Sequence, residues 1–197
     1  METNQYYLII CEGASEVAYV QELNRFLSEN GCALTLGVKD AQGGSFKKIR
    51  LLCRSLHIRM GNVFVMVDRD IYFDEASANR KQYEKEMDKL PKFLFQYYNF
   101  EDFLLMHCSP EIVLKWRDRV KDKGHFVTPL SAREYEPIFS EFIHEYTDEL
   151  KFMQEWQKGD MPFEITKERL MNLFANQGEA GLPRSEFAEF LMRRISL

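Results

Sequence analysis

The stretch Asn62-Val-Phe-Val-Met-Val-Asp-Arg-Asp70 decides the fold of this chain. Residues 63–67 are an unbroken apolar run rich in β-branched valine, which is typical of a strand buried on both faces inside a parallel sheet. Asp68 and Asp70 follow at its end. Because residues i and i+2 of an extended chain point to the same side, these two carboxylates are expected to share one side of the sheet.

Two carboxylates on one side repel each other unless a positive charge lies between them. A hard divalent cation with oxygen ligands, above all Mg²⁺, is the usual remedy. The alternative is a solvated strand-to-loop junction, because Asp is also a good turn former. On this stretch alone both interpretations stay open.

The first half of the chain alternates between strands and helices. β-Prone apolar segments predict strands at 5–11, 34–38, 63–67 and 92–98. Helical spacing or helix-favouring composition predicts helices at 16–29, from 46 to about 60, at 75–90 and at 100–107. Ser15 is the expected N-cap of the first helix. This order predicts an α/β fold, with a parallel sheet flanked by helices.

From residue 109 onward the pattern is helical throughout. Ser131 and Glu134 form a capping box, and an apolar stripe from Phe139 to Met153 runs over four turns. Large aromatic stripes need an outside surface to cover them. We therefore expect an α/β domain over residues 1–108 and an all-helical C-terminal region, 109–197, packed on it.

Composition narrows the class of protein. The chain has 197 residues, 45% of them apolar, which suits one sizeable domain and argues against disorder. Its net charge of −5 means that nucleic-acid binding would need a local basic patch. The four cysteines lack metal-ligand spacing and are typical of a reducing compartment. Without a signal peptide or an apolar span, we expect a soluble, cytoplasmic protein with no membrane contact.

Carboxylates follow three of the predicted strands. Glu12 ends the first, Asp68 and Asp70 end the third, and Glu101 and Asp102 come after the fourth. Functional groups of an open parallel sheet gather at the carboxyl ends of its strands, so these acids are expected to converge. Such a convergence predicts a cation site suited to phosphoryl transfer. Acyl transfer is disfavoured, because no Ser or Cys has a His near it in a recognisable motif.

These motifs, in this order, resemble a TOPRIM domain. That family is marked by a Glu after its first strand and an Asp-x-Asp after a later one, matched here by Cys11-Glu-Gly-Ala-Ser-Glu16 and Val67-Asp-Arg-Asp70. The segment from Asn99 to His107 resembles more narrowly the RloB-like branch, although Phe103 stands where that branch usually has Trp. The similarity covers roughly residues 5–107.

The resemblance implies a Mg²⁺-dependent nuclease that hydrolyses nucleic-acid phosphodiesters, with Mn²⁺ able to substitute. RloB-like proteins sit among bacterial defence genes, so it also implies anti-phage defence. By motif position, Glu12 would be the general acid/base or a metal contact. Asp68 and Asp70 would be metal ligands, and Glu101 an additional one. Whether a partner ATPase or a homo-oligomer is needed stays open.

Three further residues are weaker candidates for the same site. Glu16 lies one helical turn beyond Glu12 and could face the same edge, or it could simply favour the positive N-terminus of its helix. Asp102 neighbours Glu101. His107 closes the last motif, but a buried, hydrogen-bonded histidine is the alternative.

Basic side chains suggest where nucleic acid could bind. Lys47, Arg50 and Arg54 fall opposite the apolar stripe of the second helix, and the segment 115–123 is rich in positive charge. Both could follow a phosphate backbone, and Trp116 could stack on an exposed base. The alternative is that these are ordinary solvated helix faces.

Two other classes of protein stay open. One is a non-enzymatic module of TOPRIM-like fold that binds nucleic acid or a partner. The other is a different α/β phosphotransfer fold. A receiver domain needs two acids after its first strand, where only Glu12 stands here. A haloacid-dehalogenase-type phosphatase has Asp-x-Asp after its first strand, whereas here it follows the third.

Overall fold

The computed structural model describes residues 5–43, 46–56, 60–68, 85, 92–96, 99–125, 130–177 and 184–195. Its strands are β1 (Gln5–Cys11), β2 (Leu34–Asp40), β3 (Val63–Asp68) and β4 (Lys92–Gln96). Its helices include α1 (Ala14–Glu29), α2 (Phe46–Ser55), α5 (Phe100–Leu105) and α6 (Pro110–Lys121). They continue with α7 (Ala132–Glu145), α8 (Thr147–Gln154), α9 (Lys167–Asn176) and α10 (Glu186–Met192), and a 3-10 turn precedes β3 at Met60–Asn62.

The described strands form a parallel sheet in the order β2-β1-β3-β4. The chain leaves β1 through α1 to reach β2, then crosses back through α2 to pair β3 with the other side of β1. The strand order therefore reverses between β1 and β3. In open α/β sheets this topological switch point is where ligands bind, outside the carboxyl ends of the strands.

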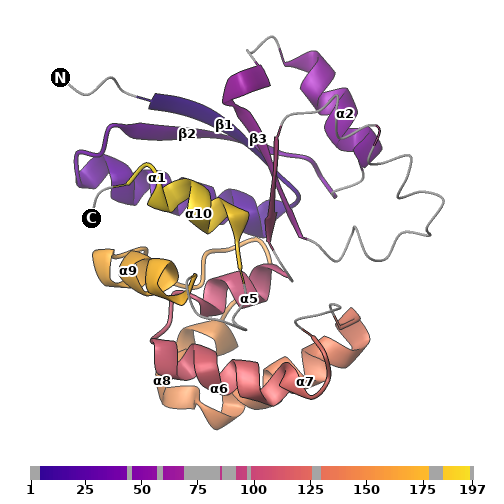
Figure 1. Cartoon of the computed structure of the whole chain (residues 1–197), viewed down its shortest axis with the longest axis vertical. Coiled ribbons are helices and arrows are strands. Elements are labelled where there is room, and N and C mark those ends of the chain that lie inside the picture. Colours follow the sequence, from indigo (N-terminus) through magenta and orange to yellow (C-terminus); the bar gives the residue numbers. More distant parts are fainter. Residues whose placement is uncertain are drawn as a thin grey trace.

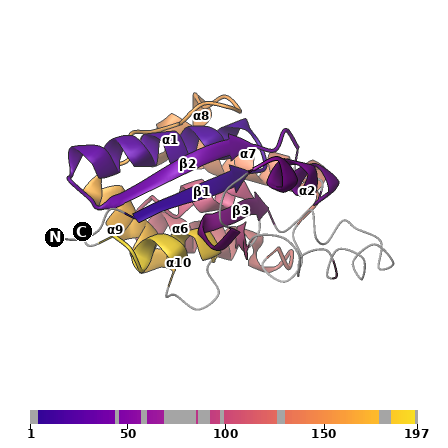
Figure 2. The same ribbon diagram turned by 90° about the horizontal axis from the view of Figure 1, so that it is seen from above.

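The alternation of side chains along each strand gives the sheet a core on both faces. Odd-numbered residues of β3 pack against α2, and its even-numbered residues join the larger core shared with α1 and α10. Figure 1 shows α2 on one side of the sheet and α1 and α10 on the other. Figure 2 shows α1 running along β2, which it contacts. Asp68 belongs to the even series, so it lies on the α1 face.

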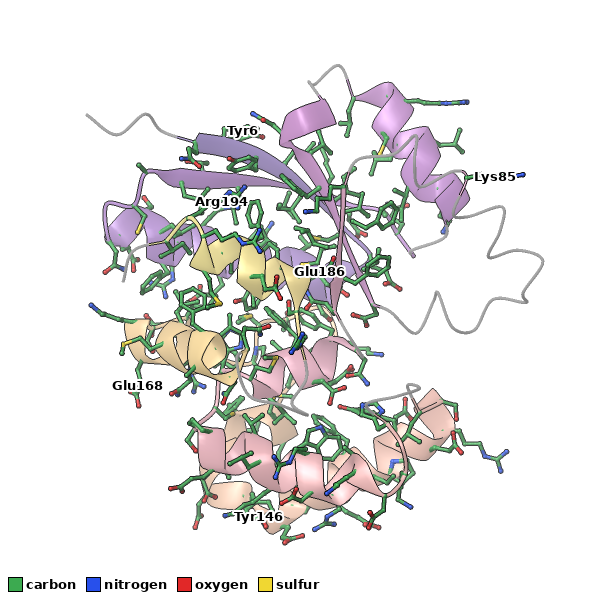
Figure 3. The ribbon with its side chains drawn as sticks, viewed as in Figure 1. Tyr6, Lys85, Tyr146, Glu168, Glu186 and Arg194 are labelled. Atoms are coloured by element: carbon green, nitrogen blue, oxygen red, sulfur yellow. The ribbon has the colours of Figure 1, made fainter. Side chains whose placement is uncertain are left out.

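The C-terminal helices extend the larger core: their buried side chains belong to the same apolar cluster as those of β1 and α1. At β4, Glu186 of α10 accepts a hydrogen bond from the Phe95 amide at 3.1 Å. The Arg194 guanidinium lies over the rings of Tyr7 and Phe190. Figure 3 labels Glu186 and Arg194, both on the yellow C-terminal segment beside the sheet. The α/β class, with a parallel sheet and a helical C-terminal region, is confirmed.

Some expected boundaries differ from the structure. The stripe from Phe139 to Met153 is divided between two helices, because the backbone leaves helical geometry at Tyr146 (φ −113°, ψ 45°). Helix α1 begins at Ala14 with Gly13 as N-cap, so Ser15 lies within the first turn. The helix expected at 75–90, apart from residue 85, lies outside the described residues. In the part of the chain that is described, no helix has the length and apolar character to cross a membrane.

Candidate metal centre

The first acid of the site is fixed at the end of β1. The Glu12 backbone amide donates to the Met66 carbonyl of β3 at 3.2 Å, so the pairing of β1 and β3 continues past the last strand residue. The Glu12 side chain then turns towards β3, where its Oε2 accepts a hydrogen bond from the Asp68 amide at 3.1 Å. Glu12 thus lies at the topological switch point between the two strands.

The second acid links β3 to α5. Asp68 is the last residue of β3, and its Oδ2 accepts a hydrogen bond from the Phe100 amide at 3.1 Å. Asn99 caps the same helix by accepting from the Asp102 amide at 3.0 Å. These two acceptors satisfy amides at the start of α5 and hold that helix against the end of the strand.

The third acid comes from the first turn of α1. Glu16 is 6% exposed, which is unusual for a carboxylate. Burial raises its pKa, and the negative charge of Glu101 raises it further. Hydrogen bonds from the backbone of Glu16 and Gly13, together with the positive charge of Lys158, lower the pKa and offset part of this effect. The site therefore contains a buried carboxyl group with a raised pKa, and a cation bound beside it would favour its ionised form.

Glu12, Glu16 and Asp68 form a group that could hold a metal ion. One carboxylate oxygen from each residue lies within 4.8 Å of one oxygen from each of the others. Three carboxylates at this separation repel one another in the absence of a counter-charge. The convergence expected from the sequence is therefore confirmed for Glu12 and Asp68, and Glu16 joins them.

The three acids line an open pocket of about 310 Å³. Glu101 lines it too, and its Oε1 is 4.0 Å from the Nζ of Lys158, an exposed side chain on the same wall. Lys158 is positioned by Gly159, which has φ +100° and donates its amide to Ser15 Oγ of α1 at 3.0 Å. A left-handed φ favours glycine, so the turn that presents Lys158 depends on that residue.

Other predicted residues are only partly described. Asp70 lies outside the described residues, so the structure does not test its place in the site. Lys47 and Arg50 lie on α2, but their side chains are outside the described part. Arg54 is exposed on the same helix and does not line the acidic pocket.

Asp102 is turned away from the acidic pocket, although Glu101 before it lines that pocket. Consecutive residues of an α-helix point about 100° apart, so neighbours need not share a surface. Asp102 is 1% exposed and accepts hydrogen bonds from Trp116 Nε1 at 2.7 Å and Tyr135 OH at 3.2 Å. Its other oxygen accepts from His125 Nε2 at 2.8 Å. The described contacts assign it to the core, and Trp116 is too buried to stack on a base.

His107 is likewise a core residue. Its Nδ1 is 3.2 Å from the Phe103 carbonyl, which can only accept, so Nδ1 carries the proton. Its Nε2 then accepts from the Tyr19 hydroxyl at 2.9 Å. Complete burial lowers the pKa of His107 to about 3, so the ring is neutral at physiological pH. The alternative of a buried, hydrogen-bonded histidine is the one the structure supports.

Sequence reasoning missed two residues that line the pocket, Trp156 and Lys158. Both follow α8, far along the chain from the acidic motifs. The glycine and proline of Gly159-Asp-Met-Pro162 indicate a turn there, but such a pattern does not say which surface the turn meets. Comparisons of this chain with protein-family models, with curated proteins and with solved structures found no match.

Proposed function

We propose that this protein is a Mg²⁺-dependent nuclease of TOPRIM type that hydrolyses phosphodiesters of nucleic acid. One observation carries the proposal: Glu12, Glu16 and Asp68 meet at the topological switch point of a parallel sheet. Oxygen-only ligand sets of this kind suit hard divalent cations, whereas zinc sites usually include Cys or His.

The spacing of the three acids suits Mg²⁺. Ligands of an octahedral Mg²⁺ lie about 2.1 Å from the ion, so two direct ligands are at most about 4.2 Å apart. The separation of up to 4.8 Å between the carboxylate oxygens is close to that limit. Small side-chain shifts, or water between a carboxylate and the ion, would complete the coordination, since protein-bound Mg²⁺ usually keeps several waters.

The side chains around the pocket have distinct roles in this proposal. Bound Mg²⁺ would supply Lewis-acid polarisation of a phosphoryl oxygen and acidify a water molecule. Glu12 follows β1, whereas Asp68 ends β3, so Glu12 can move a proton to or from the reacting oxygens while Asp68 holds the ion. Lys158, 80% exposed at the rim, can contact a phosphate of the substrate strand. Anti-phage defence, a cytoplasmic location and Mn²⁺ as a substitute ion are parts of the proposal that rest on family resemblance and composition.

The proposal is tested by cleavage assays on labelled single- and double-stranded DNA and RNA. Wild-type protein should cut at least one of them with Mg²⁺ or Mn²⁺ and none with EDTA. Asp68→Asn should abolish cleavage and weaken Mn²⁺ binding, whereas Asp118→Asn, at an exposed position of α6, should change neither. Wild-type activity in Asp68→Asn would refute the assignment. Cation-dependent binding without any cleavage would favour the non-enzymatic binding module.

A further inference from the structure

A second pocket, of about 270 Å³, adjoins the metal centre. It lies between one face of α7 and the end of α8, and it shares two lining residues, Glu101 and Trp156, with the acidic pocket. Pockets that enclose a whole small-molecule ligand typically measure about 300–1,000 Å³. The volume of the second pocket is below that range. It therefore suits one ring system of a larger ligand, the rest of which would lie in the adjoining acidic pocket.

The walls of the second pocket combine apolar and polar side chains. Phe139, Ile143 and Met153 are buried residues that give it an apolar lining, while Glu136 and Ser140 are exposed. An apolar pocket with a few polar groups is the usual form of a small-ligand site. Glu101 and Glu136 both line this pocket, so their negative charge would disfavour a second phosphate there, whereas an uncharged ring with amino groups would be accepted.

Trp156 forms the wall between the two pockets, and its ring is held in place. Its Nε1 donates a hydrogen bond to the Asp160 carbonyl at 2.8 Å. Its ring centroid is 6.5 Å from that of Phe100, whose amide is bound by Asp68. The ring is only partly buried, so it retains accessible surface. A fixed, partly exposed indole is a suitable surface for stacking a base.

We propose that this second pocket, lined by Glu101, Glu136, Phe139, Ser140, Ile143 and Trp156 among others, is a base pocket. It would receive a nucleobase of the strand whose phosphate lies at the metal centre. This inference rests on the proposed function, because it takes the phosphate position from the Glu12, Glu16 and Asp68 group. In a nucleotide, one sugar joins the base to its phosphate, so the two groups lie close together. Two pockets that share a wall can therefore hold the phosphate and the base of the same nucleotide. The Glu136 carboxylate can accept hydrogen bonds from exocyclic amino groups of the base.

The test compares two strands that differ only in their bases. A 12-nucleotide cytosine strand and a fully abasic strand of the same length are titrated into wild-type protein, with Ca²⁺ replacing Mg²⁺ to keep both strands intact. Loss of one stacked base costs about 5- to 150-fold in affinity. Wild-type protein should therefore prefer the cytosine strand by at least the lower figure.

Two variants assign this preference to the pocket. Ser140→Phe fills the pocket from an exposed position of α7, and Trp156→Leu removes the stacking surface. Both should bind the cytosine strand about as weakly as wild-type protein binds the abasic one. Ala175→Phe is the matched control, since it adds the same ring at an exposed position of α9 that lines neither pocket, and it should keep the full preference.

Tryptophan emission gives an independent readout. The sequence has two tryptophans, and Trp116 is fully buried, so quenching on addition of the cytosine strand would report Trp156. The base pocket is overturned if wild-type protein shows no base preference, or if Ser140→Phe and Trp156→Leu both retain it.

The proposed function is checked separately, by the shift in melting temperature that Mn²⁺ produces in wild-type protein but not in Asp68→Asn. A Mn²⁺ shift without base preference overturns the base pocket alone. Base preference without a Mn²⁺ shift overturns the metal centre alone, and absence of both overturns both.

Discussion

The Glu12 carboxylate accepts a hydrogen bond from the Asp68 backbone amide at 3.1 Å, across 56 residues of sequence. The bond joins the ends of two neighbouring parallel strands through a side chain that belongs to the candidate metal centre. Any change of Glu12 therefore affects both the charge of the site and the position of the Asp68 backbone. A useful variant must separate these two effects.

Glu12→Gln separates them, because the amide oxygen of Gln can still accept the hydrogen bond from Asp68. We expect the variant to fold normally and to bind nucleic acid in the presence of Mg²⁺ almost as tightly as wild-type protein. Cleavage should fall by at least about 10²-fold, the lower end of the usual contribution of general acid–base catalysis. Single-turnover rates measured beside binding titrations check this, and a wild-type rate would refute the role given to Glu12.

Glu16→Gln should have opposite effects with and without metal. Without metal it removes a buried carboxyl group near other acids, so the melting temperature should rise by about 2–4 °C, the size expected for about 1 kcal/mol in a chain of this length. With Mn²⁺ at 100 times its Kd, wild-type protein should gain about 2.7 kcal/mol of stability and the variant much less.

Thermal melts with and without Mn²⁺ measure both effects of Glu16→Gln. Glu141→Gln, on the exposed surface of α7, is the control and should leave the melting temperature and the Mn²⁺ shift unchanged. A metal-free variant less stable than wild-type protein would contradict the view that Glu16 is electrostatically unfavourable in the absence of a cation.

The α/β class and the meeting of Glu12 with Asp68 could be predicted from the sequence, because both follow from strand order. An unbroken valine-rich strand and short-range helical periodicity carry enough information to place the strand ends together. The burial of Asp102 could not be predicted in the same way. Its partners Trp116, His125 and Tyr135 come from later parts of the chain, and their approach depends on how the C-terminal helices pack.

The same limit explains the division of the Phe139–Met153 stripe. Periodicity continues across Tyr146, but the backbone turns there, and a hydrophobic pattern does not record a change of direction between two helices that face one core. The second pocket lies beside this junction and depends on it, so it too could not be predicted from the sequence.

Asp102→Asn should destabilise the fold without changing the candidate metal ligands Glu12, Glu16 and Asp68. Asn offers one acceptor oxygen in place of two, and its amino group would face a donor of Trp116, Tyr135 or His125. A buried donor left without an acceptor costs about 1–3 kcal/mol. We therefore expect Asp102→Asn to lower the free energy of unfolding, measured in urea, by at least about 1 kcal/mol. Asp122→Asn, exposed at the end of α6, should change stability little. A neutral effect of Asp102→Asn would mean that the buried network contributes little.

The C-terminal region should not fold alone. Its buried side chains share one apolar cluster with the sheet, and the Ile165 amide donates to Glu22 of α1 at 3.0 Å. Expressed without residues 1–108, the segment 109–197 would expose this face, so we expect a non-cooperative melt and self-association. A monodisperse monomer with a cooperative thermal transition would show instead that the region is an independent domain.

The burial of His107 should make stability depend on pH. Its pKa is about 3 in the folded protein, against about 6.5 for an ordinary histidine. Between these values the unfolded chain binds more protons than the folded one, so the free energy of unfolding falls as the pH is lowered from about 6.5 towards 3. One such group contributes a slope of up to about 1.4 kcal/mol per pH unit. Above about pH 6.5 the ring is neutral in both the folded and the unfolded chain, so His107 causes no loss of stability there.

His107→Gln tests this because Gln can donate to the Phe103 carbonyl and accept from Tyr19, yet does not titrate. Urea unfolding of wild-type protein and variant at several pH values between 4 and 7 should show a shallower pH dependence in the variant. His144→Gln, at an exposed position of α7, should keep the wild-type slope. If His107→Gln also kept the wild-type slope, burial of the His107 ring would not be the cause of the pH dependence, and the lowered pKa assigned to it would be wrong.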